Sequence, residues 1–129
     1  MEARAVQKHI RQSPRKIRRV IDEVRGKTVN EALNLLHFLP HRAARPTEKT
    51  IRSAVYNLID KNPDARIDEE SLVIREIYAD EGPTLQRFQP AARGRTHPIQ
   101  KKSTHLTVVV GEKEEEAVGE EAEEVEAGA

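Results

Sequence analysis

GPTLQRFQPAARGRTHPIQKKSTH, residues 82–105, contains five lysines and arginines but no aspartate or glutamate. Three prolines and two glycines interrupt it, so the stretch cannot continue as a helix. The runs on either side, Leu72 to Ala79 and Thr104 to Val110, are rich in the β-branched and aromatic residues typical of strands. We therefore expect one long β-hairpin whose distal part, about residues 80–106, forms an arm that leaves the body.

The charge of the chain is divided into two opposite blocks. Residues 1–111 carry 21 Lys and Arg against 13 Asp and Glu, which gives +8. Residues 112–129 carry one lysine against nine glutamates, which gives −8. We expect a single domain over residues 1–111 that attracts a polyanion, followed by an acidic disordered tail. The tail could shield the basic body from the wrong RNA or simply keep the chain soluble.

Three segments have the spacing of amphipathic helices. The first begins at Ser13 and Pro14, with a side-chain cap and a proline at the first helical position, and stops at Gly26. It has an apolar face formed by Ile17, Val20, Ile21 and Val24. The second opens with a capping box of Thr28 and Glu31 and ends before Pro40.

The sequence allows two starts for the third helix. It begins at about His41 or Pro46 and continues to Asp60, and a start at His41 predicts a kink at the proline. Residues 3–10 precede the helices, and we expect them to form a first strand. Together these elements predict an α+β fold, with three helices packed on a small three-stranded antiparallel sheet and the long β-hairpin arm.

Several function classes are excluded by what the sequence lacks. The absence of cysteine removes disulfides, thiolate metal sites and cysteine nucleophiles. His37 and His41 are four residues apart, but Pro40 lies between them and no further ligand completes a metal site. No nucleotide-binding loop or nucleophile elbow is present, and adjacent acidic residues such as Asp22 and Glu23 point in different directions. We therefore expect no enzyme, no metal and no cofactor.

The remaining composition favours a small protein that binds a polyanion. Nothing at the start resembles a signal peptide, and no apolar run approaches the ~20 residues that span a bilayer. Four aromatic residues and no tryptophan are too few for a row of stacked bases. We expect a soluble, cytoplasmic protein with no membrane partner that does not form homo-oligomers.

Several motifs in a fixed order resemble one known family, that of bacterial large-subunit ribosomal protein twenty-two. The resemblance covers essentially all of residues 3–110. It is carried by Ser13, Pro14, Arg15, Lys16, Ile17 and Arg18, by Arg25, Gly26, Lys27, Thr28 and Val29 with Glu31, Ala32 and Leu33, by Ser53, Ala54 and Asn57, and by the arm residues Asp80, Glu81, Gly82, Pro83, Gly94, Arg95, Lys101, Lys102 and His105, which lead into Thr107, Val108, Val109 and Val110.

The resemblance implies a structural role in the large ribosomal subunit. The body would sit on the outer surface of the subunit beside the tunnel exit, and the hairpin would pass inward between segments of ribosomal RNA. The tip would line the nascent-peptide exit tunnel near a constriction shared with large-subunit protein four. Expected partners are large-subunit ribosomal RNA, the neighbouring proteins near the exit and the constriction, and the nascent peptide in passing. The family also binds early in subunit assembly.

The basic residues and the resemblance together define the candidate site. Expected RNA contacts are Arg11, Ser13, Arg15, Lys16, Arg18, Arg19, Lys27, Thr84, Gln86, Arg87, Arg93, Gly94, Arg95, His97, Lys101, Lys102, Ser103 and His105. The expected tunnel-lining tip is Pro90, Ala91, Ala92, Arg93 and Gly94. Ala91 stands where the family usually has arginine, Gln86 replaces a usual lysine, and Tyr56 stands where a small residue is common.

A second function class remains open from the sequence. A free-standing nucleic-acid chaperone, or an RNA binder linked to transcription, could use the same basic arm. The two hypotheses differ in whether binding requires one particular folded RNA.

Overall fold

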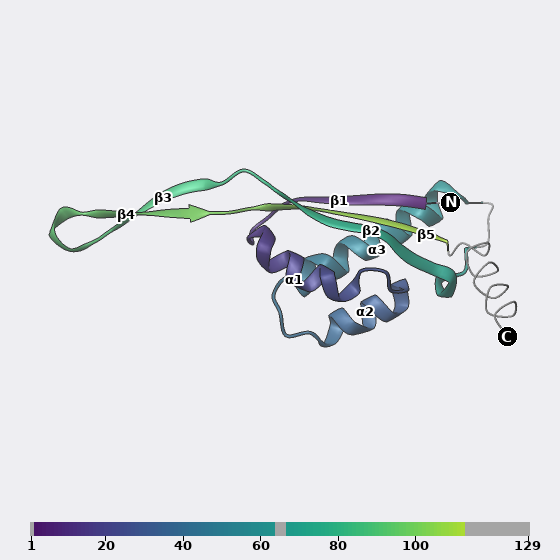
Figure 1. Ribbon diagram of the computed structural model, residues 1–129. Coiled ribbons are helices and arrows are strands. Elements are labelled where there is room, and N and C mark those ends of the chain that lie inside the picture. The colour runs from purple at the N-terminus through teal and green to yellow at the C-terminus, as the bar shows by residue number, and fades with distance from the viewer. Residues whose placement is uncertain (1, 64–66, 113–129) are drawn as a thin grey trace, which may run out of the picture.

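The computed structural model describes residues 2–63 and 67–112, and the acidic tail expected from the sequence therefore lies, apart from Glu112, outside the described residues. In chain order (Figure 1) the elements are β1 (Glu2–Ile10), α1 (Pro14–Val24), α2 (Val29–Phe38), α3 (Ala44–Lys61), a 3-10 turn η1 (Glu69–Ser71), β2 (Leu72–Glu81), β3 (Leu85–Pro90), a second turn η2 (Ala92–Gly94), β4 (Thr96–Lys101) and β5 (Thr104–Glu112).

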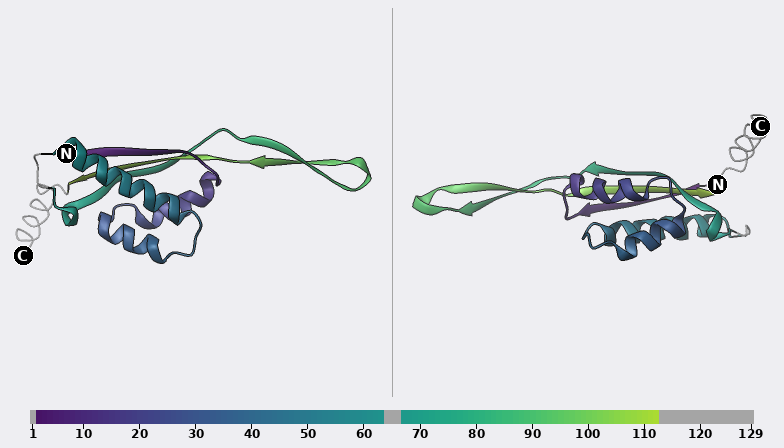
Figure 2. Two further views of the ribbon diagram at one scale, coloured as in Figure 1. Left: turned by 180° about the vertical axis from the view of Figure 1, so that it is seen from behind. Right: turned by 60° about the horizontal axis from the view of Figure 1, so that its bottom comes forward.

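The body is built on the predicted three-stranded antiparallel sheet, and its strand order is β1-β5-β2. Val108 in the central strand pairs with Ala5 on one side and with Ile77 on the other. All three helices lie against one face of this sheet, as Figures 1 and 2 show. The predicted α+β class with helices on a three-stranded sheet is therefore confirmed.

The core lies between the helices and the strands. On β5 the alternate residues Leu106, Val108 and Val110 are fully buried, as the period of two in a strand requires. They pack in one cluster with helix residues spaced by three and four positions, including Ile17 and Ile21 on α1. The alternating apolar residues of the strand and the apolar residues spaced by three and four on the helices therefore pack together in one apolar layer.

Helix α1 is anchored to the edge of the sheet by two arginines. Arg18 Nη2 donates to the carbonyl oxygen of Ala79 at 2.9 Å, and Arg25 Nη2 donates to that of Ile77 at 3.0 Å. The helix ends at Val24, and Gly26 then adopts a φ of 79°, a left-handed conformation that favours glycine. The stop predicted at this glycine is confirmed.

The caps of the first two helices differ from each other. Ser13 occupies the N-cap position of α1, but its side chain makes no capping hydrogen bond, so that part of the prediction is wrong. Thr28 at the start of α2 does accept a hydrogen bond through Oγ1, from the Glu31 backbone N–H at 3.4 Å. Pro14 presets the first turn of α1, because its φ is already helical.

Because only Thr28 makes a capping bond, removing its hydroxyl should lower the free energy of unfolding more than removing that of Ser13. Thr28→Ala should lower the free energy of unfolding by about 1 kcal/mol, because the Glu31 N–H loses its partner. Ser13→Ala should change it by less than about 0.5 kcal/mol, since no capping bond is lost. Urea denaturation of both variants measures the difference, and equal losses would contradict this assignment of the caps.

Helix α3 starts at neither of the two positions considered from the sequence. It begins at Ala44, and Pro46 lies within the first turn. Backbone N–H groups in a first turn have no carbonyl partner inside the helix, so the missing N–H of proline removes no bond there. The carbonyl of Pro46 also accepts a hydrogen bond from Thr50 Oγ1 at 2.7 Å.

The arm is a separate two-stranded sheet formed by β3 and β4. The ladder between β2 and β5 ends at the pair Glu81 and Thr104, followed by one bond from Gly82 N–H to the Ser103 carbonyl at 2.9 Å. Pro83 has no N–H with which to continue the ladder. The arm expected at about residues 80–106 therefore leaves the body at Gly82, and the pairing resumes further out (Figure 1).

Candidate nucleic-acid interface

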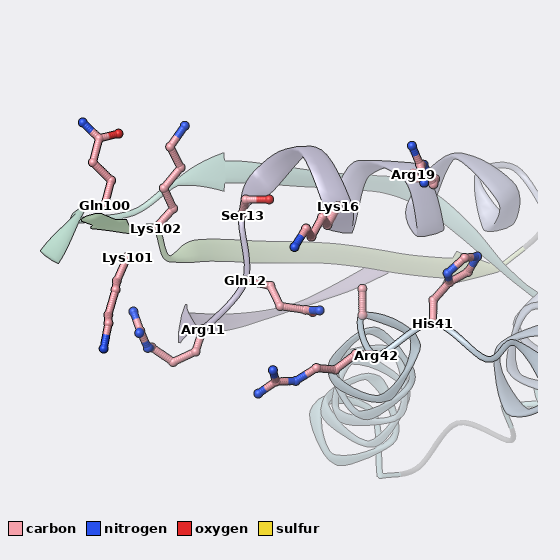
Figure 3. Close-up of a pocket in the computed structure, with 11 residues that line it drawn as sticks. Arg11, Gln12, Ser13, Lys16, Arg19, His41, Arg42, Gln100, Lys101 and Lys102 are labelled. Carbon is pink, nitrogen blue, oxygen red and sulfur yellow. The ribbon is translucent and has the colours of Figure 1, made fainter. Parts of the chain in front are cut away.

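A basic hollow lies where the arm joins the body, and we refer to it as the root hollow (Figure 3). It has a volume of about 630 Å³ and is lined from the start of α1, the α2–α3 connection and the end of β4. Its lining residues are Arg11, Gln12, Ser13, Lys16, Arg19, His41, Arg42, Ala43, Gln100, Lys101 and Lys102. Six of these are lysine or arginine and none is acidic.

The six cations of the root hollow make no ion pair within residues 2–63 and 67–112. Other arginines of the body do form ion pairs, for example Arg25 with Asp22 at 3.0 Å. Cations crowded together without counter-charges repel one another, which costs folding free energy. An arrangement of this kind is typical of a surface that binds phosphate groups.

Lys101 and Lys102 point to opposite sides of the strand (Figure 3). Lys101 lies beside Arg11, and Arg42 points toward the same space from the other side of the hollow. Lys102 also lines a smaller hollow formed by Ser13, Pro14, Arg15, Arg18 and Glu81. The arm root therefore presents a lysine to each of two basic surfaces.

The rest of the predicted arm residues lie along an exposed ribbon. Every residue of β3 is exposed, including Phe88, which is 70% exposed and pairs with Pro98. At the tip, Arg93 and Gly94 both have positive φ, at 63° and 71°, and reverse the chain. The predicted contacts along this ribbon are Thr84, Gln86, Arg87, Arg93, Gly94, Arg95 and His97, and the predicted tip residues 90–94 form its end.

Two predicted contact residues have structural roles at the arm root. Ser103 is only 4% exposed, and its hydroxyl donates to the Pro83 carbonyl at 2.6 Å. His105 Nδ1 accepts a hydrogen bond from the His9 backbone N–H at 3.1 Å. A Cβ added at Gly82 would lie 2.7 Å from Ser103 Oγ, so these residues hold the root in a close-packed arrangement.

The structure adds five residues to the root hollow that sequence reasoning missed: Gln12, His41, Arg42, Ala43 and Gln100. Only a weak signal existed for His41 and Arg42, a basic pair in a short connection after Pro40. Lys27, which was predicted, lies beyond the C-terminal end of α1 and does not line the root hollow.

The part of the chain that the structure describes contains no group of three or more His, Cys, Asp or Glu residues that could hold a metal ion. None of its helices is both long and apolar enough to cross a membrane.

Fold and site together define a small α+β protein with a cationic β-hairpin arm and a basic surface at the arm root. The chain belongs to the family described as ribosomal protein L22p/L17e, whose model matches residues 5–111. It is 56% identical over 115 residues, 89% of this chain and 94% of the relative, to the large ribosomal subunit protein uL22 of Salinibacter ruber. The protein of the same name from Roseiflexus castenholzii is 49% identical over 118 residues, 89% of this chain and 99% of the relative.

Proposed function

We propose that this chain binds large-subunit ribosomal RNA through the root hollow and the arm, and that the arm tip lines the nascent-peptide exit tunnel. Membership of the family makes the chain a structural constituent of the large ribosomal subunit and not an enzyme. As such it is a component of the cytoplasmic ribosome. We further propose that residues 1–111 act as one ribosomal-protein domain.

The observation that carries the RNA-binding proposal is the set of six cations with no ion-pair partner among the described residues of the body and arm. Phosphates of an RNA backbone supply the missing counter-charges and release condensed counterions when they bind. A carboxylate facing RNA would lie unpaired against phosphates, at a free-energy cost well above that of a surface charge. Its absence from residues 82–105 is consistent with this use.

The shape of the arm supports the tunnel part of the proposal. Two strands lie only about 4.8 Å apart in a sheet, so the ribbon is narrow enough to pass between RNA segments. Its tip carries the small residues Ala91 and Ala92 with one cation, Arg93. The proposed neighbours are the proteins near the tunnel exit and constriction, large-subunit protein four among them, and the nascent peptide in passing.

A salt titration of RNA binding tests the role of the root hollow. The slope of log affinity against log salt, measured with a transcript of bacterial large-subunit ribosomal RNA, should be strongly negative. Arg42→Gln should make that slope shallower by about one and weaken binding. The control Arg4→Gln removes an exposed arginine from β1, outside the root hollow, and should leave the slope unchanged. Equal slopes for both variants would contradict the proposed contact.

A further inference from the structure

A second basic surface lies on α3, the helix seen in front of the sheet in the left view of Figure 2. Arg45, Lys49, Arg52 and Tyr56 follow one another at steps of four, three and four residues, so they form one stripe on the helix. A hollow of about 500 Å³ lies along this stripe. It is lined by Arg45, Glu48, Lys49, Arg52, Ser53, Tyr56 and Asn57.

The two arginines of the stripe are fixed by one carboxylate. Glu48, with 9% of its side chain exposed, pairs with Arg45 at 3.3 Å and with Arg52 at 2.8 Å. The guanidinium-bearing side chains nevertheless remain 62% and 57% exposed. With Lys49 the stripe keeps a net positive charge, and its arginines lose less side-chain entropy when they bind a ligand.

Tyr56 is the aromatic member of this stripe. Its side chain is 62% exposed, and it makes no ring contact or hydrogen bond among the residues that the structure describes. It lies one helical turn, about 6 Å, beyond Arg52. An exposed aromatic ring beside cations provides a stacking surface for a base together with positive charge for its phosphate.

We infer that the outer face of α3 binds an unpaired nucleotide of the RNA, whose base stacks on Tyr56 while the adjoining backbone lies on Arg52 and Lys49. This inference rests on the proposed function, because it extends the same RNA-binding surface. Arg42 of the root hollow is only three residues from Arg45, so the two basic surfaces adjoin.

RNA fits this surface better than a protein partner does. Apart from Tyr56, every side chain that lines the hollow is polar or charged. A protein interface would be expected to have an apolar centre around its aromatic anchor. The net positive charge and the continuity with the root hollow match an RNA strand that leaves the arm root and follows α3.

Two substitutions at position 56 test whether the aromatic ring stacks on a base: Tyr56→Phe keeps the ring, and Tyr56→Ala removes it. We expect Tyr56→Phe to keep the affinity for a large-subunit ribosomal RNA transcript within about twofold, because the ring remains. We expect Tyr56→Ala to weaken it roughly tenfold. Since the side chain is exposed, both variants should unfold at the same urea concentration as the unsubstituted chain.

Equal affinities of the two variants would overturn the inference while leaving the proposed function intact. Failure of the unsubstituted chain to bind the transcript would overturn both. A benzophenone amino acid at position 56, activated in assembled large subunits, gives a second readout. Crosslinks to one or two unpaired nucleotides support the inference, whereas crosslinks only to a neighbouring protein contradict it.

Discussion

The double substitution Lys101→Glu with Lys102→Glu is expected to block incorporation of the chain into large subunits. The two lysines lie at the arm root and face two different basic surfaces. Each change removes a cation and adds a carboxylate that RNA phosphates repel, so affinity for large-subunit ribosomal RNA should fall by roughly a hundredfold at physiological salt. Subunit profiles of cells that carry only the variant should show accumulated assembly intermediates.

The same charge change elsewhere on the body provides the control. Arg4→Glu with Lys61→Glu alters two residues that line a different hollow, together with Glu2 and Glu76, away from the arm root. This variant should assemble normally, and both double variants should retain the fold, because surface charges contribute little to stability. Normal subunit profiles for the arm-root variant would contradict the proposed role of the two lysines.

The second large effect is expected in the core. Leu106 is fully buried on the central strand, among the residues that pack between helices and sheet. Leu106→Ala should lower the free energy of unfolding by about 3 kcal/mol, from lost apolar burial and from the cavity that remains. Urea denaturation of the purified chain measures this loss.

A substitution of a large apolar residue on the arm serves as the control for Leu106→Ala. Phe88 is a large apolar residue like Leu106, but it is 70% exposed on the arm. Phe88→Ala should change the free energy of unfolding by less than about 0.5 kcal/mol, because no core supports the arm. A loss comparable to that of Leu106→Ala would mean that the arm packs against the body in solution.

Most of the fold was predictable because its signals are local. The three- and four-residue spacing on α1 and the apolar run of β5 each define one buried face, and the structure brings these faces together. The hairpin was predicted without its interruption, in which the ladder of β2 and β5 ends at Glu81 and Thr104 and pairing resumes only at Leu85 and Lys101. The start of α3 was missed because a proline is tolerated anywhere in a first turn.

The candidate site was only partly predictable. Arg11, Lys16 and Lys101 stand out as cations in the sequence, and the structure brings them together in the root hollow. His41 and Arg42 join them only because the α2–α3 connection folds back beside the arm root, and no local pattern encodes that tertiary contact. Arg18 shows the converse, since one of its N–H groups holds α1 on the sheet.

Ultraviolet crosslinking of the chain in growing cells, followed by mapping of the crosslinked RNA positions, tests the central claim most directly. We expect sharp crosslinking sites in several widely separated stretches of large-subunit ribosomal RNA, with crosslinked peptides from the root hollow and the arm. Crosslinks scattered over messenger and transfer RNAs would contradict it and favour a free-standing RNA chaperone. An absence of RNA crosslinks would mean that these cations serve another polyanion.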